Sequence, residues 1–118
     1  MTDIATLEQL VRDVGIDTAL KLLDIFENDV EKRLAAIQNC LRQNADSTEL
    51  RFQAHSLKGL CRTYGALAGA DSAMRLQDAC DRGETDTLAQ LAQDVCDTVP
   101  ADIAAVMVAA RTLKSDET

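Results

Sequence analysis

Apolar side chains recur at three- and four-residue steps over most of the chain, which is the spacing of one face of an α-helix. A short helix is predicted over residues 3–13. The Val-Gly-Ile-Asp stretch at 14–17 ends it, and Asp17 or Thr18 can cap a second helix that runs to about Arg42. The apolar positions of this second helix include Leu20, Leu23, Phe26, Val30, Leu34, Ile37 and Leu41.

A polar loop at 43–47 separates the second helix from a third, which Asp46 or Ser47 can cap and which Gly65 can end. A fourth helix is expected from about residue 66 to Gly83, another glycine suited to the end of a helix.

The last helical pattern covers about residues 85–113 and contains Pro100, where we expect a kink or a break. Four long helices joined by short loops, with a short leading helix, predict an all-α fold. The expected architecture is an antiparallel up-down four-helix bundle with an additional N-terminal helix.

The chain has 118 residues, the usual size of one domain. We expect a single helical domain over 1–114 and a disordered tail at 115–118. The composition agrees with helix, because Ala and Leu dominate the apolar residues and aromatic residues make up only 3%.

The formal charge is −8, from 20 acidic and 12 basic residues. An excess of negative charge disfavours nucleic acid as a partner, since phosphates must be met by Lys and Arg. The sequence shows no secretory segment and no run of about 18 apolar residues, so we expect a soluble cytoplasmic protein that does not enter a membrane.

Four cysteines are spread through the helical patterns: Cys40, Cys61, Cys80 and Cys96. No two are close enough in sequence for a C-x-x-C site, and one histidine is too few for a common zinc site. Buried thiols in a reducing compartment are the simplest interpretation. A redox- or metal-responsive helical protein remains an alternative, which thiol titration with and without denaturant would separate.

His55 is the only histidine of the chain. On a helical wheel it lies opposite the apolar stripe of the third helix, which consists of Leu50, Ala54, Leu57, Cys61 and Tyr64. The neighbours of His55 on the polar face are Arg51, Phe52, Lys58, Gly59 and Arg62. The imidazole is therefore expected at the surface rather than in the core.

An exposed neutral imidazole is a competent nucleophile. Arg51, Lys58 and Arg62 form a cationic patch that would stabilise a phosphorylated side chain, and Gly59 leaves the ring accessible although glycine costs about 1 kcal/mol inside a helix. No second histidine exists to activate a Ser or Cys, so a hydrolase triad is not expected. The residues alone leave an ordinary solvated histidine open.

The segment Ala54-His55-x-Leu57-Lys58-Gly59 with Gly65-Ala66 resembles the signature of the histidine-containing phosphotransfer (HPt) domains of phosphorelays. The resemblance covers most of the chain. It implies a phosphoryl carrier, not an enzyme, with His55 as acceptor through Nε2. Lys58 and Arg62 would offer charge, Gly59 access, and Gln77, 22 residues after the histidine, a hydrogen bond to the ring.

The resemblance also implies that the domain has no ATP site and no metal of its own, the Mg²⁺ belonging to the partner. The partners would be response-regulator receiver domains and possibly a hybrid histidine kinase, which dock around His55 on a face that includes Arg51 and Phe52. A monomer is expected.

Family members usually have an apolar residue at the position of Gln53 and often a polar one at Phe52. Phe52 is thus either an exposed partner contact or a sign that the helix is rotated.

Two alternatives within this class stay open. The chain could be the phosphoacceptor domain of a larger histidine kinase, although Met1 and the short tail favour a free-standing protein. It could instead be a receiver-binding adaptor that carries no phosphate, in which case replacing His55 would leave its function intact.

Overall fold

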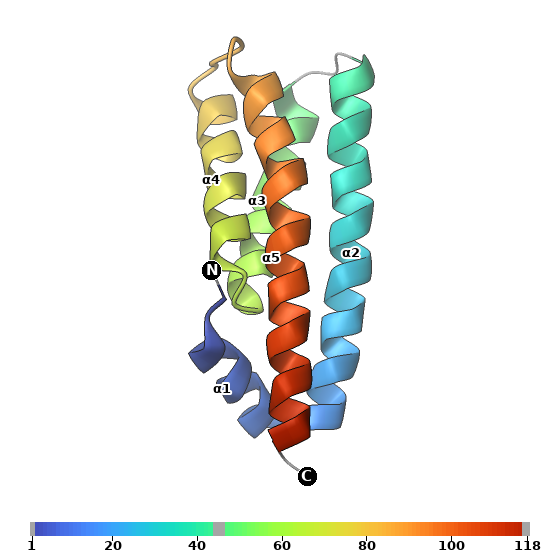
Figure 1. Ribbon diagram of the computed structural model, residues 1–118. Coiled ribbons are helices and arrows are strands. Elements are labelled where there is room, and N and C mark those ends of the chain that lie inside the picture. Colours follow the sequence, from blue (N-terminus) through green and yellow to red (C-terminus); the bar gives the residue numbers. More distant parts are fainter. Residues whose placement is uncertain (1, 44–46, 117–118) are drawn as a thin grey trace.

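Five helices form the protein in a computed structural model that describes residues 2–43 and 47–116 (Figure 1). They are α1 (Ile4–Val14), α2 (Ile16–Gln43), α3 (Ser47–Thr63), α4 (Leu67–Asp81) and α5 (Leu88–Asp116). Helices α2 to α5 run alternately up and down, each packs against the next, and α5 closes onto α2. The predicted all-α antiparallel up-down bundle with a short additional N-terminal helix is confirmed.

The core is a continuous set of apolar side chains contributed by every helix. Its largest fully buried members include Leu7, Leu23, Phe26, Ile37, Leu57 and Leu76. The ring of Phe26 stacks on that of Tyr64, with centroids 4.5 Å apart, and this contact joins α2 to the end of α3. Each such buried side chain contributes about 1.5–3 kcal/mol of transfer free energy, so the helical stripes account for the bundle.

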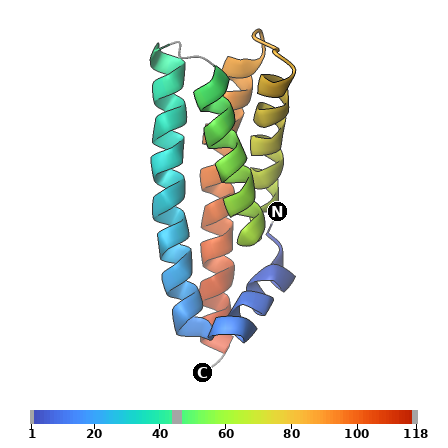
Figure 2. The same ribbon diagram turned by 180° about the vertical axis from the view of Figure 1, so that it is seen from behind.

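Helices α3 and α4 are shorter than α2 and α5, and α1 lies beneath the turn that joins them (Figures 1 and 2). The N–H of Asp3 donates to the carbonyl of Gly65 over 2.8 Å, and the Asp3 side chain caps α1 by accepting from the N–H of Thr6. Gly65 has φ of 80°, and a Cβ there would lie 2.9 Å from the Asp3 carbonyl oxygen. Gly65 thus serves both the end of α3 and the attachment of the N-terminal segment.

The two ends of α4 are satisfied in different ways. At its start Ala66 offers no side-chain cap, and the buried carboxylate of Asp102 on α5 accepts from the N–H of Gly69 over 2.8 Å. At its end Gly83 has φ of 69°, and the N–H groups of Gly83 and Glu84 return to the carbonyls of Cys80 and Ala79. This is the Schellman arrangement, so the predicted role of Gly83 is confirmed.

Some predicted boundaries differ from the structure. Helix α2 begins at Ile16, so Asp17 lies within its first turn and does not cap it. Gly15, with φ of 85°, makes the turn into α2, and its carbonyl accepts from the N–H of Ala19. Ser47 is the first residue of α3, and the other proposed cap, Asp46, lies outside the described residues.

Helix α5 also differs from its predicted course. It begins at Leu88 and continues unbroken through Pro100, whose ring is exposed, because buried Val99 and Ile103 on either side pack into the same core. Residues 115–116, which were expected in a disordered tail, belong to α5, which continues through Asp116. Residues 117–118 lie outside the described residues.

No helix among the described residues is both long and apolar enough to cross a bilayer.

Candidate functional site

His55 lies on the outer face of α3, as the wheel predicted. In Figure 2 this helix faces the viewer between α2 and α4. The predicted stripe of α3 points inward: four of its members are buried, and Tyr64 is half-buried against Phe26. His55 is exposed. The packing of the stripe therefore fixes the side of the bundle on which the imidazole is presented.

Four side chains join α3 to α4 beside the imidazole. Nδ1 of His55 lies 3.3 Å from Oε1 of Gln77, and the guanidinium of Arg51 forms an ion pair with the carboxylate of Asp81. Arg51 and His55 are four residues apart on α3, and Gln77 and Asp81 are four residues apart on α4, so each pair lies on one side of its helix. We call Arg51, His55, Gln77 and Asp81 the α3–α4 ladder.

The contact with Gln77 determines how the ring can react. An amide oxygen only accepts hydrogen bonds, so this contact favours the neutral tautomer in which Nδ1 of His55 carries the proton and donates. The other nitrogen, Nε2, then has its lone pair free. Gln77 is only 8% exposed, which makes it a fixed partner for an exposed imidazole.

The positive charge of Arg51 near the imidazole is balanced by the negative charge of Asp81, which the sequence analysis did not include. The hydrogen bond from Arg51 lowers the pKa of Asp81, and the positive charges of Arg51 and Lys58 and a hydrogen bond from Gln77 add to this. The same pairing raises the pKa of Arg51. Arg51 lies in the predicted cationic patch, but its charge is paired with the carboxylate of Asp81.

Lys58 and Arg62 lie on the same outward side of α3 as His55. Lys58 is half-buried and close enough to Asp81 to act on its pKa. Arg62 is exposed, and its Nη2 lies 3.6 Å from the sulfur of Met74 on α4. These two side chains are the cations that remain available near the imidazole.

Gly59 is exposed one turn after His55, and a Cβ built there would meet no atom within 4 Å. Its carbonyl accepts from Oγ1 of Thr63 over 2.9 Å, and α3 continues without a break through this position. The free protein therefore has no steric need for glycine here. Any steric reason must come from a molecule that approaches His55.

Phe52 and Gln53 settle the orientation of the first half of α3. Phe52 is 56% exposed and Gln53 only 8%, so Gln53 occupies the inward position and Phe52 points to solvent. Arg33 of α2 links them: its guanidinium lies 5.9 Å from the Phe52 ring centroid, and its Nη1 donates to Oε1 of Gln53 over 3.3 Å. Phe52 is thus an exposed apolar side chain that an arginine partly covers.

Two residues of this surface, Asp81 and Arg33, were missed from the sequence. Asp81 could have been found as the carboxylate four residues after Gln77 on the same helix face. Arg33 gave no signal, because its contact with Phe52 depends on how α2 and α3 align.

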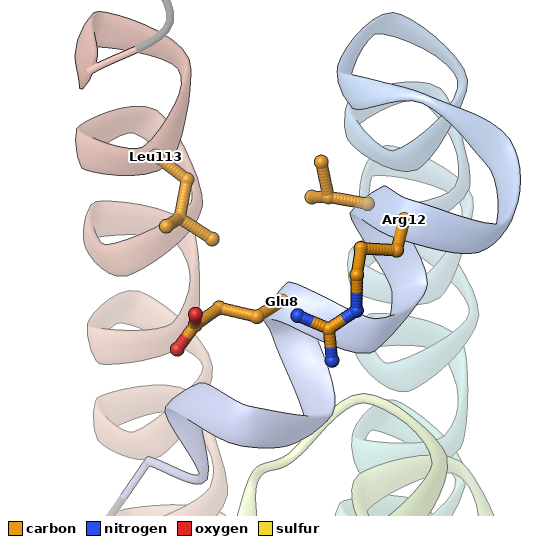
Figure 3. Close-up of a pocket in the computed structure, with 4 residues that line it drawn as sticks. Glu8, Arg12 and Leu113 are labelled. Atoms are coloured by element: carbon orange, nitrogen blue, oxygen red, sulfur yellow. The ribbon is translucent and has the colours of Figure 1, made fainter.

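One surface hollow lies apart from this site. A depression of about 200 Å³ between α1 and the end of α5 is lined by Glu8, Val11, Arg12 and Leu113 (Figure 3). None of these residues belongs to α3 or α4. Over residues 2–43 and 47–116, no three His, Cys, Asp or Glu side chains come together as a group that could hold a metal ion.

Comparison with known proteins assigns the chain to a protein family. The model of the Hpt domain family matches residues 21–112, a span that contains the whole α3–α4 ladder. The chain belongs to the Hpt domain family. Among solved structures, it resembles the crystal structure of histidine-containing phosphotransfer protein B (HptB) from Pseudomonas aeruginosa PAO1. The two share 27% sequence identity and a TM-score of 0.80, over 98% of this chain and 95% of that chain.

No curated protein sequence matches the chain significantly. Membership of the Hpt domain family supports histidine phosphotransfer in a phosphorelay as the class of function, and Hpt domains are in general phosphocarrier modules. The matched span excludes α1. The packing of α1 against the turn between α3 and α4 therefore lies outside the family match.

Proposed function

We propose that this Hpt protein relays a phosphoryl group between receiver-domain aspartates, with a phosphohistidine at Nε2 of His55 as the intermediate. The observation that carries the proposal is the contact between His55 and Gln77, which directs the proton to Nδ1 and leaves the Nε2 lone pair facing solvent. The family match supports the same assignment.

The transfer needs little from this chain beyond an oriented nucleophile. The Nε2 lone pair attacks the phosphorus of an aspartyl phosphate, the N–P bond forms, and the O–P bond breaks with its electron pair returning to the aspartate. The ring then carries a positive charge, because the proton stays on Nδ1, which continues to donate to Oε1 of Gln77. Onward transfer is the reverse reaction with a second receiver, and the Mg²⁺ that neutralises charge on the phosphoryl oxygens belongs to the receiver.

Lys58 and Arg62 act on the phosphoryl oxygens as nearby cations in this proposal, and Gly59 leaves space for the receiver to approach. The docking face surrounds His55 and includes Phe52, an aromatic side chain of the kind that carries binding free energy at transient interfaces. Arg51 lies in the same face but works as the partner of Asp81. The protein acts as a monomer, without an ATP site of its own.

A reducing compartment, the cytoplasm, fits the four cysteines, none of which forms a disulfide in the part of the chain that the structure describes. Burial raises the pKa values of Cys61, Cys80 and Cys96, which disfavours their reactive thiolate forms. This observation weighs against the alternative of a protein that works through its thiols.

The deciding experiment is phosphoryl transfer from a panel of labelled receiver domains to the wild type and to His55→Gln. Acid-labile, base-stable label on the wild type alone supports the proposal, since the chain has one histidine. Receiver binding by His55→Gln is measured in parallel, as the control for docking. If no receiver labels the wild type while several bind both proteins equally, the adaptor function replaces the carrier. Label delivered from ATP by a kinase catalytic domain alone, with none from any receiver, would instead indicate a kinase phosphoacceptor domain.

A further inference from the structure

We propose that Asp81 is a positioning residue for His55: it fixes the orientation of the Gln77 amide, and through that amide it selects the Nδ1–H tautomer of the imidazole. Only the kinetic consequence of this proposal rests on the proposed function. The tautomer itself is a property of the unphosphorylated protein.

The geometry of the α3–α4 ladder supports the assignment. Gln77 and Asp81 are one helical turn apart on the side of α4 that meets α3, a spacing at which a glutamine amide can donate to a carboxylate, and Oε1 of Gln77 faces His55. A hydrogen bond from Gln77 is among the influences that lower the pKa of Asp81. The amide of Gln77 therefore lies between an imidazole and a carboxylate. Its two ends, a carbonyl and an NH₂ group, are not interchangeable in that position.

The carboxylate decides which end faces which neighbour. An ionised carboxylate only accepts hydrogen bonds, so it requires the NH₂ group of Gln77. The reverse orientation would set the amide oxygen against the carboxylate, two acceptors with no proton between them, and would turn the NH₂ group toward Nδ1, which can accept only in the Nε2–H tautomer. With the NH₂ group on Asp81, the amide oxygen faces Nδ1 of His55, and Nε2 keeps its lone pair.

Arg51 holds the carboxylate in place. Its ion pair with Asp81 crosses from α3 to α4, and both side chains are a little under half exposed. Arg51 and Lys58 both favour the ionised form of Asp81, so the carboxylate remains an acceptor at neutral pH. The positioning chain therefore runs from Arg51 to Asp81, then to Gln77 and finally to His55.

The test is the tautomer of His55 in the Asp81→Ala variant, read from the ¹⁵N signals of the single imidazole. The wild type should show the protonated type of signal at Nδ1 and the unprotonated type at Nε2. Asp81→Ala should move both signals toward a mixture of tautomers, because the amide of Gln77 is free to turn. Asp81→Glu keeps a carboxylate and should restore most of the wild-type pattern.

Asp78→Ala is the matched control, because it removes one negative charge from the same turn of α4 without touching the ladder. Helix content measured by circular dichroism confirms that each variant is folded. The proposal is overturned if Asp81→Ala keeps the wild-type tautomer, or if Asp78→Ala shifts it equally.

The transfer rate at saturating receiver gives the second measurement. Asp81→Ala should lower it by about threefold to tenfold, the effect expected from losing one well-placed hydrogen bond, while Asp78→Ala leaves it unchanged. If no receiver transfers label to the wild type, the proposed function is wrong, but the tautomer result is unaffected. A labelled wild type with an unshifted tautomer in Asp81→Ala would defeat the positioning role alone.

Discussion

Nδ1 of His55 and Oε1 of Gln77 lie 3.3 Å apart across the α3–α4 interface, although 22 residues separate them in the sequence. The imidazole is exposed and the amide is nearly buried, so the mobile ring is held against a fixed group. An exposed nucleophile thus gains a defined orientation without losing its access to a partner.

Replacing Gln77 with Ala should slow phosphoryl transfer by about threefold to tenfold, because the ring loses its acceptor at Nδ1. The measurement is single-turnover transfer at saturating receiver. Gln53→Ala is the matched control: Gln53 is equally buried but contacts Arg33 and Glu49 instead of His55. Equal slowing in both variants would mean that the loss comes from helix stability and not from the ring contact.

Gly59→Ala should raise the free energy of unfolding by up to about 1 kcal/mol, since alanine favours helix and the added methyl meets nothing within 4 Å. The same variant should transfer more slowly, because the methyl group occupies space that a receiver needs. Urea denaturation and transfer kinetics check the two effects. Unchanged transfer would show that Gly59 has no part in docking.

Gly69→Ala provides the contrast for this substitution. A Cβ at Gly69 would lie 3.1 Å from the Cys61 sulfur and 3.4 Å from Val99, inside the core. Overpacking of this kind typically costs about 1–3 kcal/mol, so this variant should be destabilised.

Phe52→Ala should weaken receiver binding by about tenfold, equivalent to roughly 1.4 kcal/mol, if its exposed ring lies at the interface. Its effect on folding should stay within about 1 kcal/mol, the size of its cation–π contact with Arg33. Val108→Ala is the control, since Val108 is similarly exposed at 59% but lies on α5. Titration calorimetry with a receiver distinguishes them, and equal affinities for the two variants would remove Phe52 from the docking face.

The pH dependence of stability should report the burial of Cys61. Burial, with a smaller contribution from the charge of Asp102, raises the pKa of the Cys61 thiol from its ordinary 9.0 to about 12. The native state therefore holds this proton where the unfolded state has lost it, so the contribution is constant below pH 9.0 and is lost between there and pH 12. Denaturation of the wild type and of Cys61→Ala across that range checks the difference. Parallel pH profiles for the two proteins would contradict it.

The features that depend on one helix at a time could be predicted from the sequence. The wheel of α3 placed His55 outside and Leu57 inside, because a stripe of apolar residues must face the core whatever surrounds it. Gly65 and Gly83 marked helix ends because both adopt positive φ there. The helix pattern and short loops were sufficient to predict the bundle.

The features that depend on how two helices align could not be predicted from the helix patterns, and the approach of Gln77 to His55 was expected only from the family resemblance. The pairing of Arg51 with Asp81 was missed, because Asp81 lies opposite Arg51 only through the register of α4 against α3. The course of α5 through Pro100 is a similar case, since local preference favoured a break and packing on both sides of the proline prevailed. Asp81 gave one local signal, its position four residues after Gln77, but its ion pair with Arg51 depends on the alignment of the two helices.

The carboxylate of Asp102 has a consequence for the order in which this protein assembles. It supplies the acceptor at the start of α4 from a position 33 residues later in the chain, where no local cap exists. The first turn of α4 is therefore completed only when α5 arrives, so the α3–α4 hairpin should not mature ahead of the last helix. Gln77 lies on α4, and the alignment of His55 should appear in the final cooperative step of folding.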